Sequence, residues 1–190
     1  MLDIPCVIFA GGKSSRMGED KALLPFAGFN TLTQFQLSRL HKIFKTVYIS
    51  CKDKNKFDFT ADFIEDMQSD SVYAPTIGFT TVFKTLQTDS FFALSVDAPF
   101  VSLDEINKLI AFDESSVDAT IAKTDFGIQP LCGIYHRSLE CKFLEMQENN
   151  SHKLGMLLKS SVTKYLYFKD EVPFLNMNHP SDYTLALTLV

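Results

Sequence analysis

Short apolar runs of strand length alternate along the chain with stretches of helical spacing. The strand-like runs lie at residues 4–9, 46–51, 63–64, 91–96, 118–123, 131–135 and 163–168. Apolar residues recur at helical spacing in 32–44, 77–86, 102–112, 138–147, 151–158 and 180–189. Ser102 followed by Glu105 is a capping-box pattern, which predicts where one helix begins. Strands that alternate with helices predict a mostly parallel sheet with helices on both faces.

The length and composition fit a single domain. A chain of 190 residues, 46% hydrophobic and 22% charged, can bury a full core and has the balance of a globular protein. No internal repeat, low-complexity tract or linker interrupts it. We therefore predict one α/β domain over residues 1–190, a Rossmann-like three-layer sandwich.

Charge and cysteine usage narrow the partners and the compartment. The formal net charge of −5 argues against nucleic acid or a membrane surface as a partner, because both favour basic proteins. The N-terminal apolar run is short and lacks the basic start of a signal peptide. Cys6, Cys51 and Cys132 lie in strand-like runs, which predicts buried thiols, and no cysteine has metal-site spacing. These features predict a cytoplasmic protein.

A glycine-rich loop with several cations follows the first strand, in the sequence FAGGKSSRMGEDK. Gly11 and Gly12 let main-chain N–H groups approach a phosphate closely. Lys13, Arg16 and Lys21 place three cations within nine positions, although the chain is acidic. Such a cluster can neutralise the charge that builds on a leaving pyrophosphate. The loop therefore predicts a triphosphate site.

Two commoner phosphate loops are excluded by the spacing. A P-loop that ended in Gly12-Lys13-Ser14 would require glycine at position 7, where Val7 stands. Adjacent glycines do not match the dinucleotide pattern G-x-G-x-x-G either. The alternative of a plain solvated turn is disfavoured by the cations and by the preceding buried strand.

Asp97 follows the apolar run FFALSV directly. In open α/β sheets, ligands bind beyond the carboxyl ends of the strands. A carboxylate at such an end is a suitable ligand for a hard cation that bridges phosphates. The alternative, an aspartate that caps a turn or helix, is disfavoured by the phosphate loop expected at the same sheet edge.

The glycine loop also carries a family resemblance. FAGGKSSRMGEDKALLPF resembles the signature A-G-G-x-S-x-R-M-G-x-D-K-x-L of the molybdenum cofactor guanylyltransferase family. Four later stretches are similar to the family as well: IED at 64–66, DAPF at 97–100, QPL at 129–131 and NMNHPSD at 176–182. The resemblance covers nearly the whole chain and implies the fold of the nucleotide-diphospho-sugar transferases.

The resemblance implies a GTP site and a metal. The residues expected to contact GTP are Phe9, Ala10, Gly11, Lys21, Asp66 and Asp97. The first three would contact its guanine and ribose through main-chain groups. Asp66 would lie at the base and Lys21 at the phosphates. Asp97 would hold Mg²⁺, with Mn²⁺ as an alternative. Arg16, Lys21 and Asp97 would be the catalytic residues.

The resemblance also implies an acceptor site, formed by Arg16, Gly18, Gly78, Asn176 and Asn178. Alternate residues of an extended segment face the same side, so both asparagine amides could reach one ligand. For Asn178 the alternative is a cap on the following helix. His41, His136, His152 and His179 show no metal or catalytic spacing, and we expect surface or cap roles for them.

The expected reaction joins GMP from GTP to the terminal phosphate of molybdenum-loaded molybdopterin and releases pyrophosphate. The expected partners are these two substrates, with transient contacts to cofactor-insertion proteins or target molybdoenzymes. Two stretches depart from the family: residues 74–78, where many relatives have G-P-L-A-G, and Ser50-Cys51-Lys52, where many have asparagine. Two alternatives stay open: a sister enzyme that uses CTP or a sugar or alditol phosphate, and an inert nucleotide-binding regulator.

Overall fold

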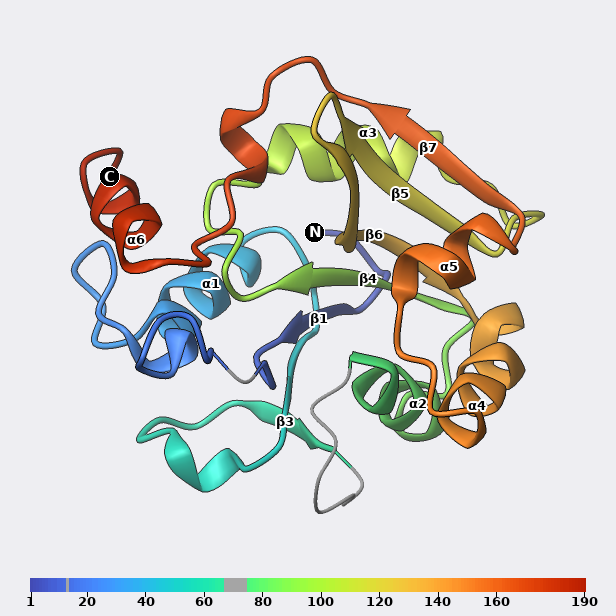
Figure 1. Ribbon diagram of the computed structural model, residues 1–190, viewed down its shortest axis with the longest axis horizontal. Coiled ribbons are helices and arrows are strands. Elements are labelled where there is room, and N and C mark those ends of the chain that lie inside the picture. The colour runs from blue at the N-terminus through green and yellow to red at the C-terminus, as the bar shows by residue number, and fades with distance from the viewer. Residues whose placement is uncertain (13, 67–74) are drawn as a thin grey trace.

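The structure is a computed structural model that describes residues 1–12, 14–66 and 75–190. Lys13 of the glycine loop and Ala74 of the departing stretch lie outside these ranges. The strands are β1 (Cys6–Phe9), β2 (Val47–Cys51), β3 (Asp62–Glu65), β4 (Ser90–Ser95), β5 (Ala119–Thr124), β6 (Gly127–His136) and β7 (Thr163–Tyr167). They form one sheet in the order β3-β2-β1-β4-β6-β5-β7 (Figure 1).

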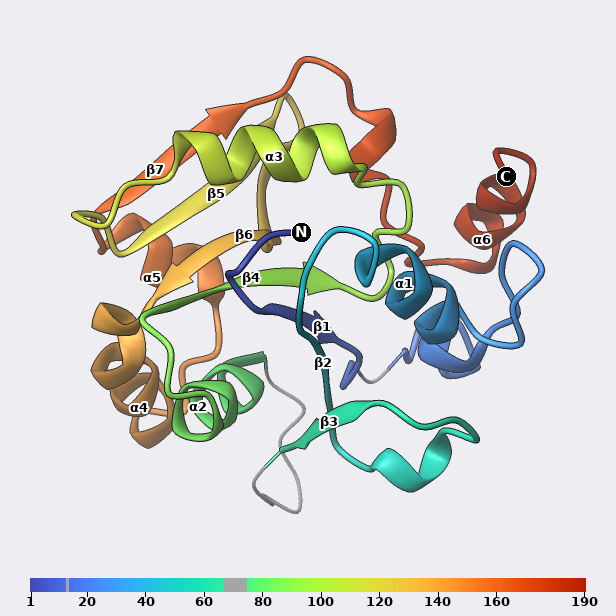
Figure 2. The same ribbon diagram turned by 180° about the vertical axis from the view of Figure 1, so that it is seen from behind.

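The sheet is mostly parallel, as the alternating pattern predicts. Strand β6 runs antiparallel to β4 and β5, and the other neighbouring pairs are parallel. The helices are α1 (Leu32–Leu40), α2 (Pro75–Thr85), α3 (Leu103–Phe112), α4 (Glu140–Glu148), α5 (Leu154–Lys159) and α6 (Pro180–Leu187). Helices α1 and α3 cover one face of the sheet, whereas α2, α4 and α5 cover the other (Figures 1 and 2).

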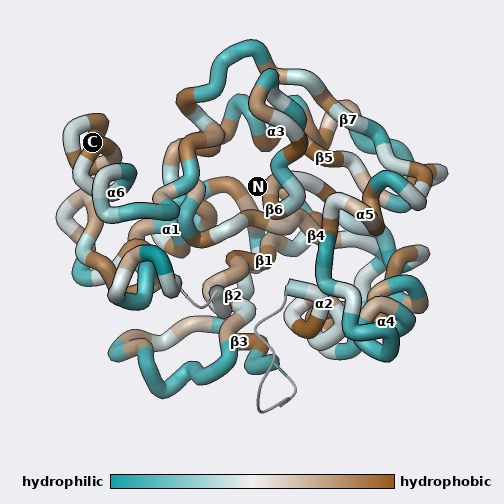
Figure 3. The backbone as a smooth tube through the Cα atoms, viewed as in Figure 1, coloured by the Kyte–Doolittle hydropathy of each residue, from teal (hydrophilic) through white to brown (hydrophobic). Residues whose placement is uncertain are grey.

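Alternation along the strands divides the core between these two faces. In β1, Cys6 and Ile8 pack on the side of α1 and α3, while Val7 and Phe9 pack on the side of α2 and α4. Hydrophilic residues gather at the periphery, for example in the turn between β2 and β3 (Figure 3). Cys6, Cys51 and Cys132 are buried, as predicted. Burial raises the pKa of the Cys51 thiol to about 12, so it is an inert core group.

Element boundaries differ most from the sequence expectation in two places, by four residues each. Helix α1 ends at Leu40, not at residue 44, although Ile43 and Phe44 are buried after the helix and so extend its apolar pattern. Strand β6 begins at Gly127, not at 131, because a bulge opposite Ile121 and Ala122 accommodates the proline within it. The Ser102–Glu105 capping box at the start of α3 is confirmed.

The strand order creates a switch point next to β1. The chain runs from β1 to β2 and β3 on one side, then crosses to β4 on the other side of β1. The segments that leave the carboxyl ends of β1 and β4 therefore diverge and leave a crevice between them. Four residues of the glycine loop (residues 11–18), Gly11, Gly12, Ser14 and Arg16, lie at this crevice with Asp97. No helix in the described part of the chain is long and apolar enough to cross a membrane.

Candidate functional site

Two cavities meet at the carboxyl ends of β1 and β4. The loop cavity, of about 380 Å³, is lined by the glycine loop and by the ends of β2 and β3. The bulge cavity, of about 360 Å³, is lined by the bulge of β6 and by the segment before α6. Both volumes suit small-molecule ligands. The two cavities share five lining residues, Pro75, Ser95, Asp97, Leu131 and Asn178.

The loop cavity brings together the residues that the sequence assigns to GTP. Phe9, Ala10, Gly11, Lys21, Asp66 and Asp97 all line it. Arg16, Gly78 and Asn178, which the sequence assigns to the acceptor, line it as well. These residues come from both ends of the chain, and the switch point of the sheet is what places them around one space. Gly18 lines neither cavity.

Asp66 closes one end of the loop cavity, just beyond β3. Its backbone N–H donates to the Cys51 carbonyl at 2.8 Å, and the Ser50 hydroxyl lies 3.4 Å from its carboxylate. A Cβ at Gly11 would lie 3.5 Å from the Asp66 Oδ2, so the loop backbone passes directly beside this carboxylate. Burial raises the pKa of Asp66 to about 6. A half-buried acceptor with a raised pKa is suited to recognise hydrogen-bond donors on a ligand.

The glycine loop is held in shape by its own backbone and by the turn that follows. Ser14 has a φ of 49° and Gly18 has a φ of 78°, both in the left-handed region that glycine adopts without strain. The Ser14 hydroxyl accepts from the Lys21 N–H at 3.1 Å. Asp20 caps the short 3₁₀ helix η1 (Lys21–Leu23) through the Ala22 N–H. The loop therefore delivers Lys21 at a defined position.

Lys21 and Asp97 pair where the cavities meet. The Lys21 ammonium donates to the Asp97 carboxylate and, at 3.3 Å, to the Asn178 side-chain oxygen. The Ser95 hydroxyl donates to the other carboxylate oxygen at 2.6 Å. Only 14% of the Lys21 side chain and 12% of the Asp97 side chain are exposed, so both charges lie in a poorly solvated place. A partly buried, charge-assisted pair of this kind is stronger than an exposed ion pair.

Two residues of α1 hold the segment that carries Asp97, and sequence reasoning missed both. The fully buried Gln36 amide donates to the carbonyls of Val96 and Ala98, on either side of Asp97. Arg39 donates to the Gln36 side chain and to the carbonyl of Val101. The contacts with the carbonyls of Val96, Ala98 and Val101 join positions about sixty residues apart. The helical pattern of residues 32–44 does not indicate them.

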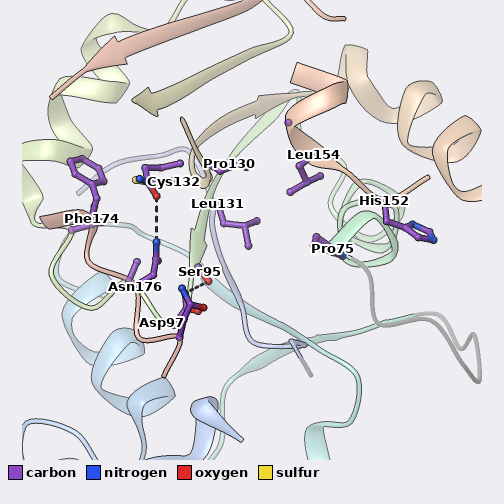
Figure 4. A pocket seen from close by; sticks show the side chains of 15 residues that line it. Pro75, Ser95, Asp97, Pro130, Leu131, Cys132, His152, Leu154, Phe174 and Asn176 are labelled. Carbon is purple, nitrogen blue, oxygen red and sulfur yellow. Dashed lines mark hydrogen bonds between the residues drawn. The ribbon is translucent and has the colours of Figure 1, made fainter. Parts of the chain in front are cut away.

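The bulge cavity is lined by amide groups, by apolar side chains and by His152. Figure 4 shows Asp97 and Asn176 on one side, and Leu154 and His152 opposite them. The Asn176 side-chain N–H donates to Gln129 Oε1 at 3.3 Å. Strand β6 runs antiparallel, so its bulge, with Gln129, lies beside the end of β4. The cavity therefore offers apolar contact and polar amide groups next to Asp97.

The structure settles the alternative for Asn178. The residue that caps α6 is His179, and the Asp182 carboxylate accepts from the N–H groups of both Asn178 and His179. The Asn178 side chain instead accepts from Lys21. Asn178 lines both cavities and is not the N-cap residue of α6, and its contact with the acceptor stays a prediction.

The histidines fit the expected surface or cap roles only in part. His41 is exposed and His179 is a cap, as predicted. His136 is the N-cap residue of the 3₁₀ helix η3 (Arg137–Leu139), and His152 is half-buried. His136 lies 3.1 Å from the Asp113 carboxylate, and His152 lines the bulge cavity with its Nδ1 2.7 Å from the Thr76 hydroxyl. Their partners are distant in sequence, so no local spacing could indicate them.

Gly78 lies in close contact with the sheet, and Phe9 is hydrogen-bonded within it. A Cβ at position 78 would lie 3.0 Å from the Ser50 hydroxyl and 3.1 Å from the Phe9 ring, so these two side chains would have to shift slightly to admit it. The Phe9 carbonyl accepts from the Val96 N–H, and its ring stacks on Phe79 at 4.6 Å. Phe9 thus reaches the loop cavity as part of its floor.

The junction of the cavities offers oxygen donors for a hard cation. The Asp97 carboxylate, the Ser95 hydroxyl and the Asn178 side-chain oxygen lie together there. Mg²⁺ is commonly held by one or two carboxylates together with substrate phosphates, and the donor set fits this mode. No group of three or more His, Cys, Asp or Glu side chains suited to a metal ion occurs in residues 1–12, 14–66 and 75–190.

Comparisons with known proteins identify the family of this chain and its fold. A molybdenum cofactor guanylyltransferase from Campylobacter jejuni subsp. jejuni is 40% identical over 95% of this chain and 94% of its own length. The structure of molybdopterin-guanine dinucleotide biosynthesis protein A from Archaeoglobus fulgidus shares the fold at a TM-score of 0.83, with 20% identity and 98% of each chain covered. A Mycobacterium tuberculosis protein solved in complex with manganese also shares it, at a TM-score of 0.71 and 14% identity over the whole of both chains. The model of the MobA-like NTP transferase domain matches residues 6–164, and the chain belongs to this family.

Proposed function

We propose that this protein transfers GMP from GTP to the terminal phosphate of molybdenum-loaded molybdopterin. The products are molybdopterin guanine dinucleotide and pyrophosphate. The observation that carries the proposal is the meeting of two cavities at Lys21 and Asp97, because a two-substrate transfer needs donor and acceptor to face each other. The substrate pair follows from the names of the relatives.

In this proposal GTP occupies the loop cavity. Asp66 accepts from the donor edge of guanine, and the backbone of Ala10 and Gly11 borders the base and ribose. The N–H groups of the glycine loop, Arg16 and Lys21 surround the triphosphate. Gly11 has no side chain, so its backbone can pass beside the Asp66 carboxylate, where a Cβ would lie 3.5 Å from Oδ2.

The acceptor occupies the bulge cavity. A pterin is a flat ring system with hydrogen-bonding edges, and it suits a space that is lined by both amide groups and apolar side chains. Asn176 and Asn178 would contact it, and Arg16 would face its phosphate. The assignments of Gly18 and Gly78 to the acceptor stay predictions from the resemblance.

The chemistry is an in-line displacement at the α-phosphorus of GTP. An oxygen of the acceptor phosphate forms the new bond to this phosphorus, and the bond to the pyrophosphate oxygen breaks. The acceptor phosphate is already ionised near neutral pH, so no general base is required. Lys21, Arg16 and the loop N–H groups stabilise charge on the leaving pyrophosphate. Mg²⁺, which Asp97 would hold with help from Ser95 and Asn178, supplies further positive charge when bound.

The reaction belongs in the cytoplasm in this proposal, with product delivered through transient contacts to cofactor-insertion proteins or target molybdoenzymes. The proposal rests on the four scattered cysteines, three of which are buried and all of which are free thiols. The two substrates are GTP and molybdenum-loaded molybdopterin, and the reaction requires neither a nucleic acid nor a membrane.

The decisive test is pyrophosphate release from each of the four NTPs, with and without molybdopterin. We expect release from GTP only when the acceptor is present, and GTP to outcompete CTP and ATP. Cytosine and adenine offer no comparable pair of donors to Asp66, so their binding leaves a buried acceptor unpaired. Asp66→Ala should reduce the preference for GTP over CTP and ATP by a larger factor than it reduces the rate with GTP. A wild type that prefers CTP would assign the chain to cytidylyl transfer, and nucleotide binding without any release would make it a regulator.

The raised pKa of Asp66 predicts a pH-dependent preference for guanine. Only the ionised carboxylate accepts both guanine donors, and its pKa of about 6 means that roughly a tenth is ionised at pH 5. Affinity for GTP relative to ATP should therefore fall about tenfold from pH 7 to pH 5. The ratio cancels the titration of the triphosphates themselves. Competition titrations measure this affinity ratio at each pH. In Asp66→Asn the ratio should not change with pH. A ratio that is independent of pH in the wild type would show that Asp66 does not recognise the base.

A further inference from the structure

Lys56 contacts both flanks of the glycine loop from outside the site. It ends the 3₁₀ helix η2 (Lys54–Lys56), in the turn between β2 and β3. Its ammonium donates to the Ala10 carbonyl at 3.1 Å and to the Asp20 carboxylate at 2.7 Å. Ala10 directly precedes the loop, and Asp20 lies just after it. One cation therefore connects the two ends of the loop.

Both contacts lead to groups that line the loop cavity. Ala10 and Asp20 are lining residues, whereas Lys56 is not. The second oxygen of Asp20 accepts from the Ala22 N–H and so caps η1, whose first residue is Lys21. A shift of Asp20 would therefore move Lys21 relative to Asp97. Through these links Lys56 can influence the reacting groups without touching substrate.

The surroundings of Lys56 make its contacts stronger than those of an ordinary surface pair. Its side chain is 21% exposed, and its ammonium lies 4.9 Å from the centre of the Phe57 ring. Lys54, on the same turn, pairs with Glu65, but its side chain is 54% exposed. Exposed ion pairs contribute little, whereas partly buried charge-assisted hydrogen bonds contribute more. Lys54 is thus a matched control from the same turn.

We propose that Lys56 is a positioning residue for nucleotidyl transfer, which clamps the two ends of the glycine loop so that Lys21 and the loop N–H groups are preorganised for the triphosphate. The proposal deepens the proposed function and rests on it for the identity of the nucleotide. Preorganised donors matter most in the transition state, so the loss of the clamp should act on kcat more than on KM.

Hydrogen–deuterium exchange of the ligand-free protein tests the clamp without any turnover. In Lys56→Met, amides in residues 10–24 should exchange faster than in the wild type, while the rest of the chain is unchanged. Lys54→Met should leave exchange in 10–24 unaltered. Faster exchange along the whole chain of Lys56→Met, or equal exchange in both variants, would overturn the proposal.

Kinetics with GTP and the acceptor supply the second readout. Lys56→Met should lower kcat about tenfold, the loss expected for one charge-assisted hydrogen bond, with a smaller change in KM for GTP. Lys56→Arg, which keeps the charge and the donors, should stay within about threefold of the wild type. Equal kcat values for Lys56→Met and Lys54→Met would overturn the positioning role. If the wild type does not turn over GTP at all, the proposed function fails, and the exchange experiment still decides on the clamp.

Discussion

Asp97→Ala should abolish turnover that depends on a divalent ion, with a loss of at least roughly a thousandfold in kcat. The Asp97 carboxylate lies where the two cavities meet, with Lys21 on one oxygen and the Ser95 hydroxyl on the other. It is the acidic side chain common to both cavities, so its removal takes away the anionic ligand for Mg²⁺ between the substrates. Pyrophosphate release, followed over a titration of Mg²⁺, measures the effect.

Asp97→Asn is the control for folding. The amide keeps the shape of the side chain and a hydrogen-bond acceptor for Lys21, whereas alanine leaves that partly buried ammonium with only Asn178. Thermal unfolding of both variants should show folded proteins, because Gln36 holds the same segment through the carbonyls of Val96 and Ala98. Turnover near the wild-type rate in either folded variant would contradict the metal assignment.

Lys21→Ala should lower kcat by at least roughly a hundredfold, the loss typical of one charge stabiliser in a preorganised site. Its ammonium is at the junction of the cavities and is held by Asp97 and Asn178. We expect the change mainly in kcat, because the charge on the leaving pyrophosphate builds in the transition state. Single-turnover measurements with saturating GTP separate this step from binding.

The same variant should bind a divalent ion more tightly in the absence of nucleotide. In the ligand-free protein Lys21 neutralises Asp97, and its removal leaves the carboxylate to a metal ion. Titration with Mn²⁺ alone, followed by calorimetry, should show a stronger signal for Lys21→Ala than for the wild type. Lys54→Ala, on the exposed turn, should change neither kcat nor Mn²⁺ binding. Small and equal losses in the two variants would show that Lys21 does not stabilise the charge on the leaving pyrophosphate.

The fold could be predicted from the sequence because each element carries its own periodic pattern. Short apolar runs indicated the strands, apolar residues at helical spacing indicated the helices, and the Ser102–Glu105 box marked one helix start. Errors occurred where apolar burial continues beyond an element, as at Ile43 and Phe44, or where a bulge admits a proline, as in β6. In both cases tertiary packing, not the local pattern, sets the boundary.

Much of the candidate site was also visible in the sequence. The glycine loop and Asp97 each directly follow a buried strand, and parallel strands bring their carboxyl ends to one edge of the sheet. Local pattern and a general rule of topology were therefore enough to place Lys21 near Asp97. Asp66 and Asn178 came from the resemblance, and they line the same cavity.

The sequence by itself determined the elements, the phosphate loop and the carboxylate beside it, because these depend on neighbours along the chain. Only the tertiary structure decided that Gln36 holds the Asp97 segment, that Lys56 joins the ends of the glycine loop and that His152 lines the bulge cavity. The partners of these side chains lie far away in the sequence, and Lys56 reaches its partners only because its turn folds back towards the glycine loop. Such contacts are fixed by the order of strands in the sheet, and no local spacing of residues encodes them.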